Sequence, residues 1–471
     1  MNTQTHPQLG ELGQVEANLL ARLDNIPITR GIWTIIGLVT MVWIIEAFDI
    51  GMIGSALVFL KQTWPLTSAQ TGMLGSAGTF GIVIGLLPAG WLADRYGRKK
   101  VLLVGVTVFS AFTYFGVFTT NINQLAVLRF VAGLGEGAVF TAPYLIIAEF
   151  VNKKRRGEAV GWANFLLTAA YVLPNAAGVW TMHRGFSAAL SWHILFSIGG
   201  ALIIIVPVLW LWLPESPRFL LKRGKVDEVR RMIERFEDEA RLPHDTALTN
   251  ADTLSAIQAA ADRRWGFRDL LRQPYLKRAF VSYCALGSPL ALFYAMLVYG
   301  PTIFAQMGFG SSNSLLYVGC LQVVSGFGTI LASFCSDRFG RPKTHATFMF
   351  IAAVCLVLVG LQLPTPFMIA AAVMAWFFGL GGFAMSKLYM SEQFPTQLRA
   401  TGAATGEVVT RFLLGVVMVY YIPALLKVLH AQGLFMIFGL AMALLVLPLL
   451  LVGIETAGRS VEETGKDGIL S

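Results

Sequence analysis

The chain contains GWLADRYGRK at residues 90–99 and a related stretch, SFCSDRFGRP, at residues 333–342. Four pairs of charged residues share one separation of 243 positions: Asp94 with Asp337, Arg98 with Arg341, Glu149 with Glu392, and Arg156 with Arg399. Chance is a poor explanation for four pairs at one offset. The pattern therefore indicates an internal duplication, in which the second half of the chain repeats the first.

Long apolar stretches surround both copies of the motif. Hydrophobic residues make up 55% of the 471 positions and charged residues only 13%, which is too little polar surface to cover a soluble protein of this length. A stretch of about 20 apolar residues crosses roughly 30 Å of hydrocarbon as a helix. Twelve such spans are predicted, at residues 33–59, 69–92, 101–119, 124–148, 159–181, 191–213, 279–303, 313–335, 346–363, 367–389, 402–426 and 432–453.

The twelve spans predict an all-α integral membrane protein with two six-helix bundles. The bundles are expected at residues 33–213 and 279–453. Residues 1–32, 214–278 and 454–471 then form an N-terminal segment, a central loop and a C-terminal tail. Transporters use parallel repeats of this kind to build a central site between two halves that rock around it.

The central loop includes GKVDEVRRMIERF (224–236), where apolar residues recur at helical spacing between charged ones. This pattern predicts an amphipathic helix that lies against the cytoplasmic face. Pro243 and the polar residues after it predict a break before a second helix, which carries Leu254, Ile257 and Ala261. An ordinary interdomain linker is the alternative interpretation.

Basic residues are concentrated in the loops on one side of the predicted membrane. That side carries Arg95, Arg98, Lys99, Lys100, Lys153, Lys154, Arg155, Arg156, Arg338, Arg341 and Lys343. The opposite loops contain only Lys61, Arg184 and Lys427. Because cytoplasmic loops retain Lys and Arg, both termini and the central loop are predicted to be cytoplasmic, in a multi-pass protein of the cell inner membrane. The first thirty residues also lack the pattern of a signal peptide.

The sequence does not indicate an enzyme or a nucleic-acid-binding protein. A nucleophile elbow, a metal motif and a nucleotide-binding loop are all missing from it, so no catalytic residue, metal or cofactor is predicted. The net charge of +9 is not gathered into one basic patch, so no nucleic-acid partner is expected. The cysteines fall in apolar stretches without metal-ligand spacing and are expected to be buried: Cys284, Cys320, Cys335 and Cys355.

Between the second and third of twelve helices, GWLADRYGRK resembles the signature of the major facilitator superfamily. Further stretches resemble markers of its sugar-porter-like branch, which also includes carriers of organic ions: EFVNKKRRG (149–157), PESPRFLL (214–221), EQFPTQLRATG (392–402) and ETAGRSVEE (455–463). The resemblance implies a cytoplasmic gate of ion pairs that closes the two bundles together. Its members are Gly90, Asp94, Arg98, Glu149, Arg156, Glu215, Arg218, Asp337, Arg341, Glu392 and Arg399.

Two carboxylates interrupt the first span. Glu46 and Asp49 lie three residues apart, which places them on one face of a helix and in one environment. Two carboxylates in a poorly hydrated site do not both ionise cheaply, so the pair is a candidate proton-coupling site. The stretch WIIEAFDIGMIG (43–54) is similar to the acidic pair of nicotinate permeases and aromatic-acid:proton symporters, although Glu46 stands where Asp is common. A pair satisfied permanently by arginines is the alternative.

The fourth span carries a charged pair in LRFVAGLGEGA (128–138). Arg129 resembles an arginine of the aromatic-acid carriers, and a guanidinium binds a carboxylate through two hydrogen bonds, so it is a candidate substrate anchor. A structural partnership with the first-helix acids is the alternative for Arg129. Glu136 stands two turns further on, in place of the usual apolar residue, and is a candidate second protonation site; altered specificity is the alternative.

Two more cations lie in the second half. Arg411 is a candidate anchor for an anionic substrate, while neutralisation by Glu407 one turn earlier is the alternative. Lys387 occupies a position where similar sugar porters usually carry tryptophan, and its alternative is a side chain that extends to water. Asn175, Tyr294 and Trp376 complete the predicted substrate-binding residues.

These features predict a proton-coupled symporter that imports a small aromatic or heteroaromatic carboxylate, such as nicotinate or a benzoate-type acid, by alternating access as a monomer. A sugar or polyol:proton symporter is one alternative, although the seventh span lacks the paired glutamines of similar sugar porters. An organic-cation carrier is another, because Glu46, Asp49, Glu136 and Glu407 are all acidic. A non-transporting membrane sensor is the third.

Overall fold

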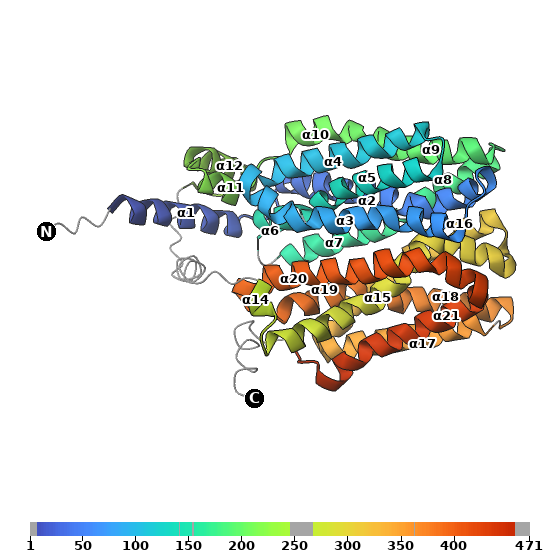
Figure 1. Ribbon diagram of the computed structural model, residues 1–471. Coiled ribbons are helices and arrows are strands. Elements are labelled where there is room, and N and C mark those ends of the chain that lie inside the picture. Colours follow the sequence, from blue (N-terminus) through green and yellow to red (C-terminus); the bar gives the residue numbers. More distant parts are fainter. Residues whose placement is uncertain (1–6, 141, 153–154, 245–266, 362, 457–471) are drawn as a thin grey trace.

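The computed structural model describes residues 7–140, 142–152, 155–244, 267–361 and 363–456. In this part of the chain the regular secondary structure is entirely helical. The helices lie nearly parallel in two bundles, one formed by each half of the sequence (Figure 1). The first helix, α1 (Pro7–Asn25), and the last residues of α21 lie at the same end of the molecule, called here the terminal end; the opposite end is called the distal end.

The first bundle follows α1 directly. It consists of α2 (Arg30–Thr63), α3 (Ser68–Tyr96), α4 (Arg98–Phe115) with η1 (Gly116–Phe118), α5 (Ile122–Val139), α6 (Ala142–Phe150), α7 (Arg156–Ala170), α8 (Val172–His183), α9 (Ala188–Ala201) with η2 (Leu202–Ile204), and α10 (Ile205–Trp212). Side chains of Thr29 and Thr67 accept hydrogen bonds from the first-turn amides of α2 and α3, which fixes where these two helices begin. The short helices α11 (Pro217–Lys222) and α12 (Val226–Ala240) then cover the terminal end.

The second bundle begins after α14 (Phe267–Leu270). It consists of α15 (Tyr275–Phe304) with η3 (Ala305–Phe309), α16 (Ser311–Phe339), α17 (Arg341–Gly360), α18 (Thr365–Gly381), α19 (Phe383–Glu392), α20 (Thr396–Thr410), the π-helical η4 (Arg411–Met418) and α21 (Val419–Val452). The positive φ angles of Gly97 (101°) and Gly340 (91°) allow the same turn in both copies of the repeated motif, between α3 and α4 and between α16 and α17.

Eleven helical segments among the described residues are long and apolar enough to cross a membrane. The last, Thr401–Val452, has 52 residues, which at 1.5 Å per residue is more than two membrane thicknesses. The helix is interrupted at His430 (φ 54°, ψ −179°), where the chain turns back at the distal end (Figure 1). This segment therefore contains two crossings, and the expected fold of two six-helix bundles is confirmed.

The two halves touch closely toward the distal end. A Cβ atom at Gly54 of α2 would overlap the carbonyl oxygen of Leu297 in α15, so the two backbones are in direct contact there. The hydroxyl group of Tyr299 donates a hydrogen bond of 3.2 Å to the carbonyl oxygen of Thr71 in α3. These contacts hold the halves together at the end that lies away from α1.

The terminal end of the first bundle is covered by an arrangement that the sequence predicted only in part. The expected amphipathic helix is α12, which buries Val229, Ile233 and Phe236. Helix α1 was not predicted, and it docks on α12 through a buried pair in which Arg22 donates two hydrogen bonds to Glu237, at 2.9 and 2.6 Å. The second predicted loop helix, with Leu254, Ile257 and Ala261, lies outside the described residues.

The expectation that all four cysteines are buried is wrong for three of them. Cys355 is buried, Cys284 and Cys335 are half-buried, and Cys320 is exposed. In a membrane protein the outer surface of the helices is itself apolar, so an apolar stretch does not distinguish the core from the lipid-facing side. No group of three or more His, Cys, Asp or Glu side chains among the described residues is arranged to hold a metal ion.

Candidate functional site

Three helices lose their regular geometry where the two halves face each other. The α7–α8 segment is interrupted at Tyr171 and the α18–α19 segment at Gly382, and the π-helical η4 begins at Arg411. Transporter sites lie at such discontinuities, because interrupted helices free backbone groups and redirect side chains. Two of the charged residues predicted from the sequence lie at or just after these interruptions, because Arg411 begins η4 and Lys387 follows Gly382 by five residues.

One buried charged cluster lies inside the first half and is called the Arg129 cluster: Asp49, Thr113, Arg129 and Glu136. A guanidinium nitrogen of Arg129 donates a 2.7 Å hydrogen bond to the Asp49 carboxylate, and the side chains are 2% and 0% exposed. The Thr113 hydroxyl donates a further hydrogen bond of 2.6 Å to Asp49 and accepts one of 3.1 Å from Arg129. These contacts join α2, α4 and α5 into one polar network in an apolar bundle.

Glu136 adds a second carboxyl group to this cluster. It is fully buried, 3.5 Å from the Arg129 guanidinium, and neither of its oxygens has a hydrogen-bond partner in the described structure. If both carboxyl groups were ionised, the cluster would carry one buried negative charge, which is energetically costly. The Arg129 cluster is neutral when it carries one proton.

A second charged cluster lies in the other half and is called the Lys387 cluster: Lys387, Glu407 and Arg411. Arg411 contacts the Glu407 carboxylate through two nitrogens, each at 3.0 Å, and also bonds to the Tyr294 hydroxyl. The Lys387 ammonium lies 3.4 Å from the other Glu407 oxygen. Two cations share one anion, so the Lys387 cluster retains one positive charge.

Aromatic rings surround these cations. Lys387 lies 4.6 Å from the ring centre of Phe383 in its own half, and 4.8 and 5.5 Å from those of Phe140 and Tyr144 in the first half. The Arg411 guanidinium lies 4.0 Å from the ring centre of Phe140. Cations above aromatic faces are stabilised by the ring quadrupole, and a desolvated contact contributes about 2 kcal/mol.

Glu46 faces the Lys387 cluster from the first half. It is 2% exposed, and neither carboxyl oxygen has a hydrogen-bond partner among the described residues. The positive charges that act on it are those of Arg411 and Lys387. Glu46 and Asp49 are neighbours as expected, but they have different partners, because side chains three residues apart diverge by about 60° around a helix. Asp49 binds Arg129, whereas Glu46 is within electrostatic range of Arg411 and Lys387 in the second half.

The other predicted substrate-binding residues are placed as follows. Tyr294 belongs to the site through its bond to Arg411. Asn175 accepts a 3.0 Å hydrogen bond from Ser55, and Trp376 packs against Phe304 with ring centres 6.2 Å apart. Neither Asn175 nor Trp376 has a described hydrogen bond, ion pair or ring contact with a member of the Arg129 or Lys387 cluster. The sequence indicated polarity or aromaticity there but not direction.

The predicted gate residues form ion pairs, but the described pairs join helices of the same half. Arg98 lies 3.0 Å from Glu149 and 3.5 Å from Asp94, all in the first bundle. Arg341 lies 2.8 Å from Glu392 in the second bundle. The ion pairs described for these residues therefore do not include the expected pairs between the halves, whose close contacts at Gly54 and at Thr71 lie toward the distal end.

The remaining gate residues have separate positions. Glu215 accepts a 3.1 Å hydrogen bond from the backbone amide of Lys99, at the start of α4. Arg156 lies 3.7 Å from Asp24 of α1. Gly90 has open space where a Cβ would stand, so its lack of a side chain is not required in this conformation. Arg218 and Arg399 lie on α11 and α20. The side chain of Asp337 lies outside the described part of the structure.

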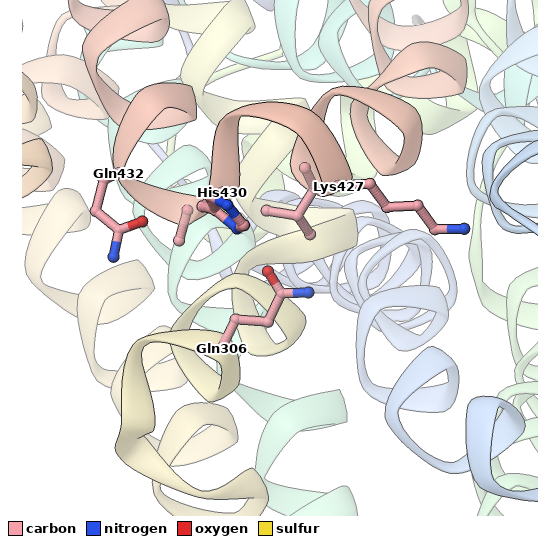
Figure 2. Close-up of a pocket in the computed structure, with 6 residues that line it drawn as sticks. Gln306, Lys427, His430 and Gln432 are labelled. Carbon is pink, nitrogen blue, oxygen red and sulfur yellow. The ribbon is translucent and has the colours of Figure 1, made fainter.

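Sequence reasoning missed the aromatic part of the site. Phe140 and Tyr144 follow Glu136 at intervals of four residues, which keeps them on one helical face. That spacing was available in the sequence, but the cations that contact these rings from the second half were not. A further pocket of about 450 Å³ surrounds the break at His430, with Gln306, Lys427 and Gln432 in its lining (Figure 2). It lies at the distal end and contains no member of either cluster.

Comparison with known proteins agrees with this architecture. A family profile described as "Sugar (and other) transporter" matches residues 34–467. The niacin transporter NiaP of Acinetobacter baylyi is 28% identical over 464 residues, which cover 95% of this chain and 100% of that protein. The 4-hydroxybenzoate transporter PcaK of the same organism is 27% identical over 395 residues, covering 83% and 84%.

Solved structures show the same fold. The inward-open xylose transporter XylE of Escherichia coli superposes with a TM-score of 0.73 at 17% identity, over 93% of this chain and 99% of that one.

The arabinose-proton symporter of Bacillus subtilis is 26% identical in sequence over 94% of this chain and 97% of that protein. Because the family profile spans most of its length, the chain belongs to the sugar (and other) transporter family of the major facilitator superfamily, and is a multi-pass membrane transporter.

Proposed function

We propose that this transporter imports a small aromatic monocarboxylate, of the nicotinate or benzoate type, together with a proton. The observation that carries the proposal is the Lys387 cluster, whose surplus positive charge is surrounded by aromatic rings and faced by the unbonded Glu46 carboxyl group. A monocarboxylate neutralises this charge, and its ring has aromatic faces to pack against. The names of the niacin and 4-hydroxybenzoate transporters support the same substrate class.

Charge balance gives the physical reason for coupling. When Glu46 is ionised, it neutralises the surplus charge of the Lys387 cluster, and an incoming anion would then enter a neutral buried site. When Glu46 carries a proton, the site keeps one positive charge and attracts one anion. Substrate and proton therefore favour each other's binding, which is the thermodynamic requirement for symport. The Arg129 cluster, with Asp49 and Glu136, holds a second proton-binding position next to Glu46.

The proposal includes an orientation and a state of assembly. Because cytoplasmic loops retain Lys and Arg, we propose that the terminal end and both chain termini face the cytoplasm, in a protein of the cell inner membrane. Each half contributes charged or aromatic groups to the site, so a single chain supplies a complete pathway and is expected to work as a monomer. Rocking of the halves would exchange the distal contacts at Gly54 for contacts at the terminal end.

A sugar:proton symporter is the second candidate, and one buried amide favours it. Gln322 of α16 is fully buried, and neither its oxygen nor its nitrogen has a described partner, so it is suited to a hydroxyl group. The arabinose-proton symporter is also similar over nearly the whole chain. An organic cation is disfavoured, because the Lys387 cluster would repel it.

Uptake into proteoliposomes tests the proposal. Wild-type protein should accumulate radiolabelled nicotinate or benzoate when the outside is more acidic, above the level in protein-free liposomes that weak acids reach by permeation. Glu46→Gln, which mimics the protonated carboxyl group, should lose gradient-driven accumulation while it still exchanges substrate across the membrane. Accumulation of xylose or a quaternary amine in place of either acid would refute the substrate class.

A further inference from the structure

Phe140 contacts both cations of the Lys387 cluster. Its ring centre lies 4.0 Å from the Arg411 guanidinium carbon and 4.8 Å from the Lys387 ammonium nitrogen. The ring belongs to the first half, whereas both cations belong to the second. Phe140 is the C-cap residue of α5, and its amide donates a 2.9 Å hydrogen bond to the Glu136 carbonyl oxygen. Its backbone is therefore held by the helix that also carries Arg129.

The contacts of Phe140 are distinctive within the described structure. All described cation–π contacts between the halves occur here, and they involve Phe140 and its neighbour Tyr144. Aromatic rings also meet between the halves elsewhere, as Phe165 and Phe327 do at 5.8 Å, but without a cation beside them. The Phe140 ring therefore both packs between the bundles and contacts the two cations of the second half.

The hydrogen-bonding groups of the cations show how an acid would lie beside this ring. Arg411 uses Nε and Nη2 for Glu407 and Nη1 for Tyr294, and Lys387 has one described ion partner, Glu407. Further N–H groups of Lys387, and one each on the Arg411 nitrogens Nη1 and Nη2, remain for a carboxylate. A carboxylate bound to a guanidinium lies in its plane. In an aromatic acid the ring extends from that carboxylate, within reach of the Phe140 ring, whose centre is 4.0 Å from the guanidinium carbon.

We propose that Phe140 is the residue that selects aromatic over aliphatic carboxylates in this carrier. The inference rests on the proposed function, since it concerns the ring of the same substrate. Offset aromatic pairs contribute an interaction beyond area burial that corresponds to about two- to twelve-fold in affinity. A saturated ring of the same size has neither the flat shape nor the quadrupole, and it is held by the carboxylate contact and by burial alone.

The test compares two acids that differ only in ring character. Benzoate and cyclohexanecarboxylate each compete with radiolabelled nicotinate for the purified full-length protein, and the ratio of their inhibition constants is measured. Wild type should favour benzoate, and Phe140→Leu should reduce this preference about two- to twelve-fold, with a smaller change for cyclohexanecarboxylate. Phe140→Tyr should retain the preference. Because both inhibition constants come from one preparation, a loss of folded protein does not change their ratio. Phe140→Met is the second variant if Phe140→Leu does not fold.

Phe165→Leu is the matched control, because it removes an aromatic ring between the halves that has no cation beside it. Its ratio should equal that of wild type. An unchanged ratio in Phe140→Leu, or an equal change in Phe165→Leu, would overturn the role of Phe140 while leaving the proposed function intact. If no carboxylate competes or binds in wild type, the proposed function fails and this inference fails with it.

Discussion

Replacement of Lys387 by glutamine tests the charge balance of the site. The change leaves Arg411 paired with Glu407 and removes the surplus positive charge of the Lys387 cluster. A hydrogen bond to a charged group contributes about 1.5–3 kcal/mol, and about 1.4 kcal/mol corresponds to a tenfold change in affinity. The dissociation constant for nicotinate should therefore rise about 10- to 150-fold.

Equilibrium binding of radiolabelled nicotinate to purified protein measures this effect, at acidic pH where Glu46 is protonated. Lys387→Arg should retain most of the affinity, because it keeps the charge. Lys427→Gln is the matched control, since Lys427 lines the separate pocket at the distal end (Figure 2). An unchanged dissociation constant in Lys387→Gln, or an equal loss of affinity in Lys427→Gln, would refute the claim that the Lys387 charge binds the substrate.

Two further predictions concern parts of the fold outside the site. Glu237→Gln removes the negative charge from the buried pair with Arg22, which costs about 3–5 kcal/mol, so the amide hydrogens of α1 should exchange faster. Glu228→Gln is the control, because Glu228 belongs to an exposed pair on α12, and it should leave the exchange of α1 unchanged. Gly54→Val places a side chain against the Leu297 carbonyl, so the distal ends should no longer close. Uptake should then be lost while nicotinate still binds, and normal uptake by Gly54→Val would contradict the distal contact.

The fold was predictable because it depends on features that repeat along the chain. The apolar spans and the shared offset between Asp94 and Asp337 indicated two six-helix halves, and the charges of Lys387, Glu407 and Arg411 stood out in apolar surroundings. The sequence also showed that Arg411 and Glu407 lie one turn apart, and the structure shows their ion pair.

The remaining features depend on contacts between segments far apart in sequence. Glu46 and Asp49 share a helix face, yet Asp49 binds Arg129 whereas Glu46 is within electrostatic range of Arg411 and Lys387, which the spacing alone does not distinguish. Helix α1 has its partner Glu237 more than two hundred residues away. Phe140 was one of 33 phenylalanines, and only the facing cations set it apart.

Calorimetric binding of nicotinate in buffers of different ionisation enthalpy, measured at mildly alkaline pH where Glu46 of the free protein has lost its proton, tests most directly the claim that substrate and proton bind together. The account predicts net proton uptake by wild type when nicotinate binds. It predicts binding without that uptake, and with weaker pH dependence, for Glu46→Gln, because this variant is neutral at every pH. Nicotinate binding by wild type without proton uptake, or equal uptake by Glu46→Gln, would contradict the account.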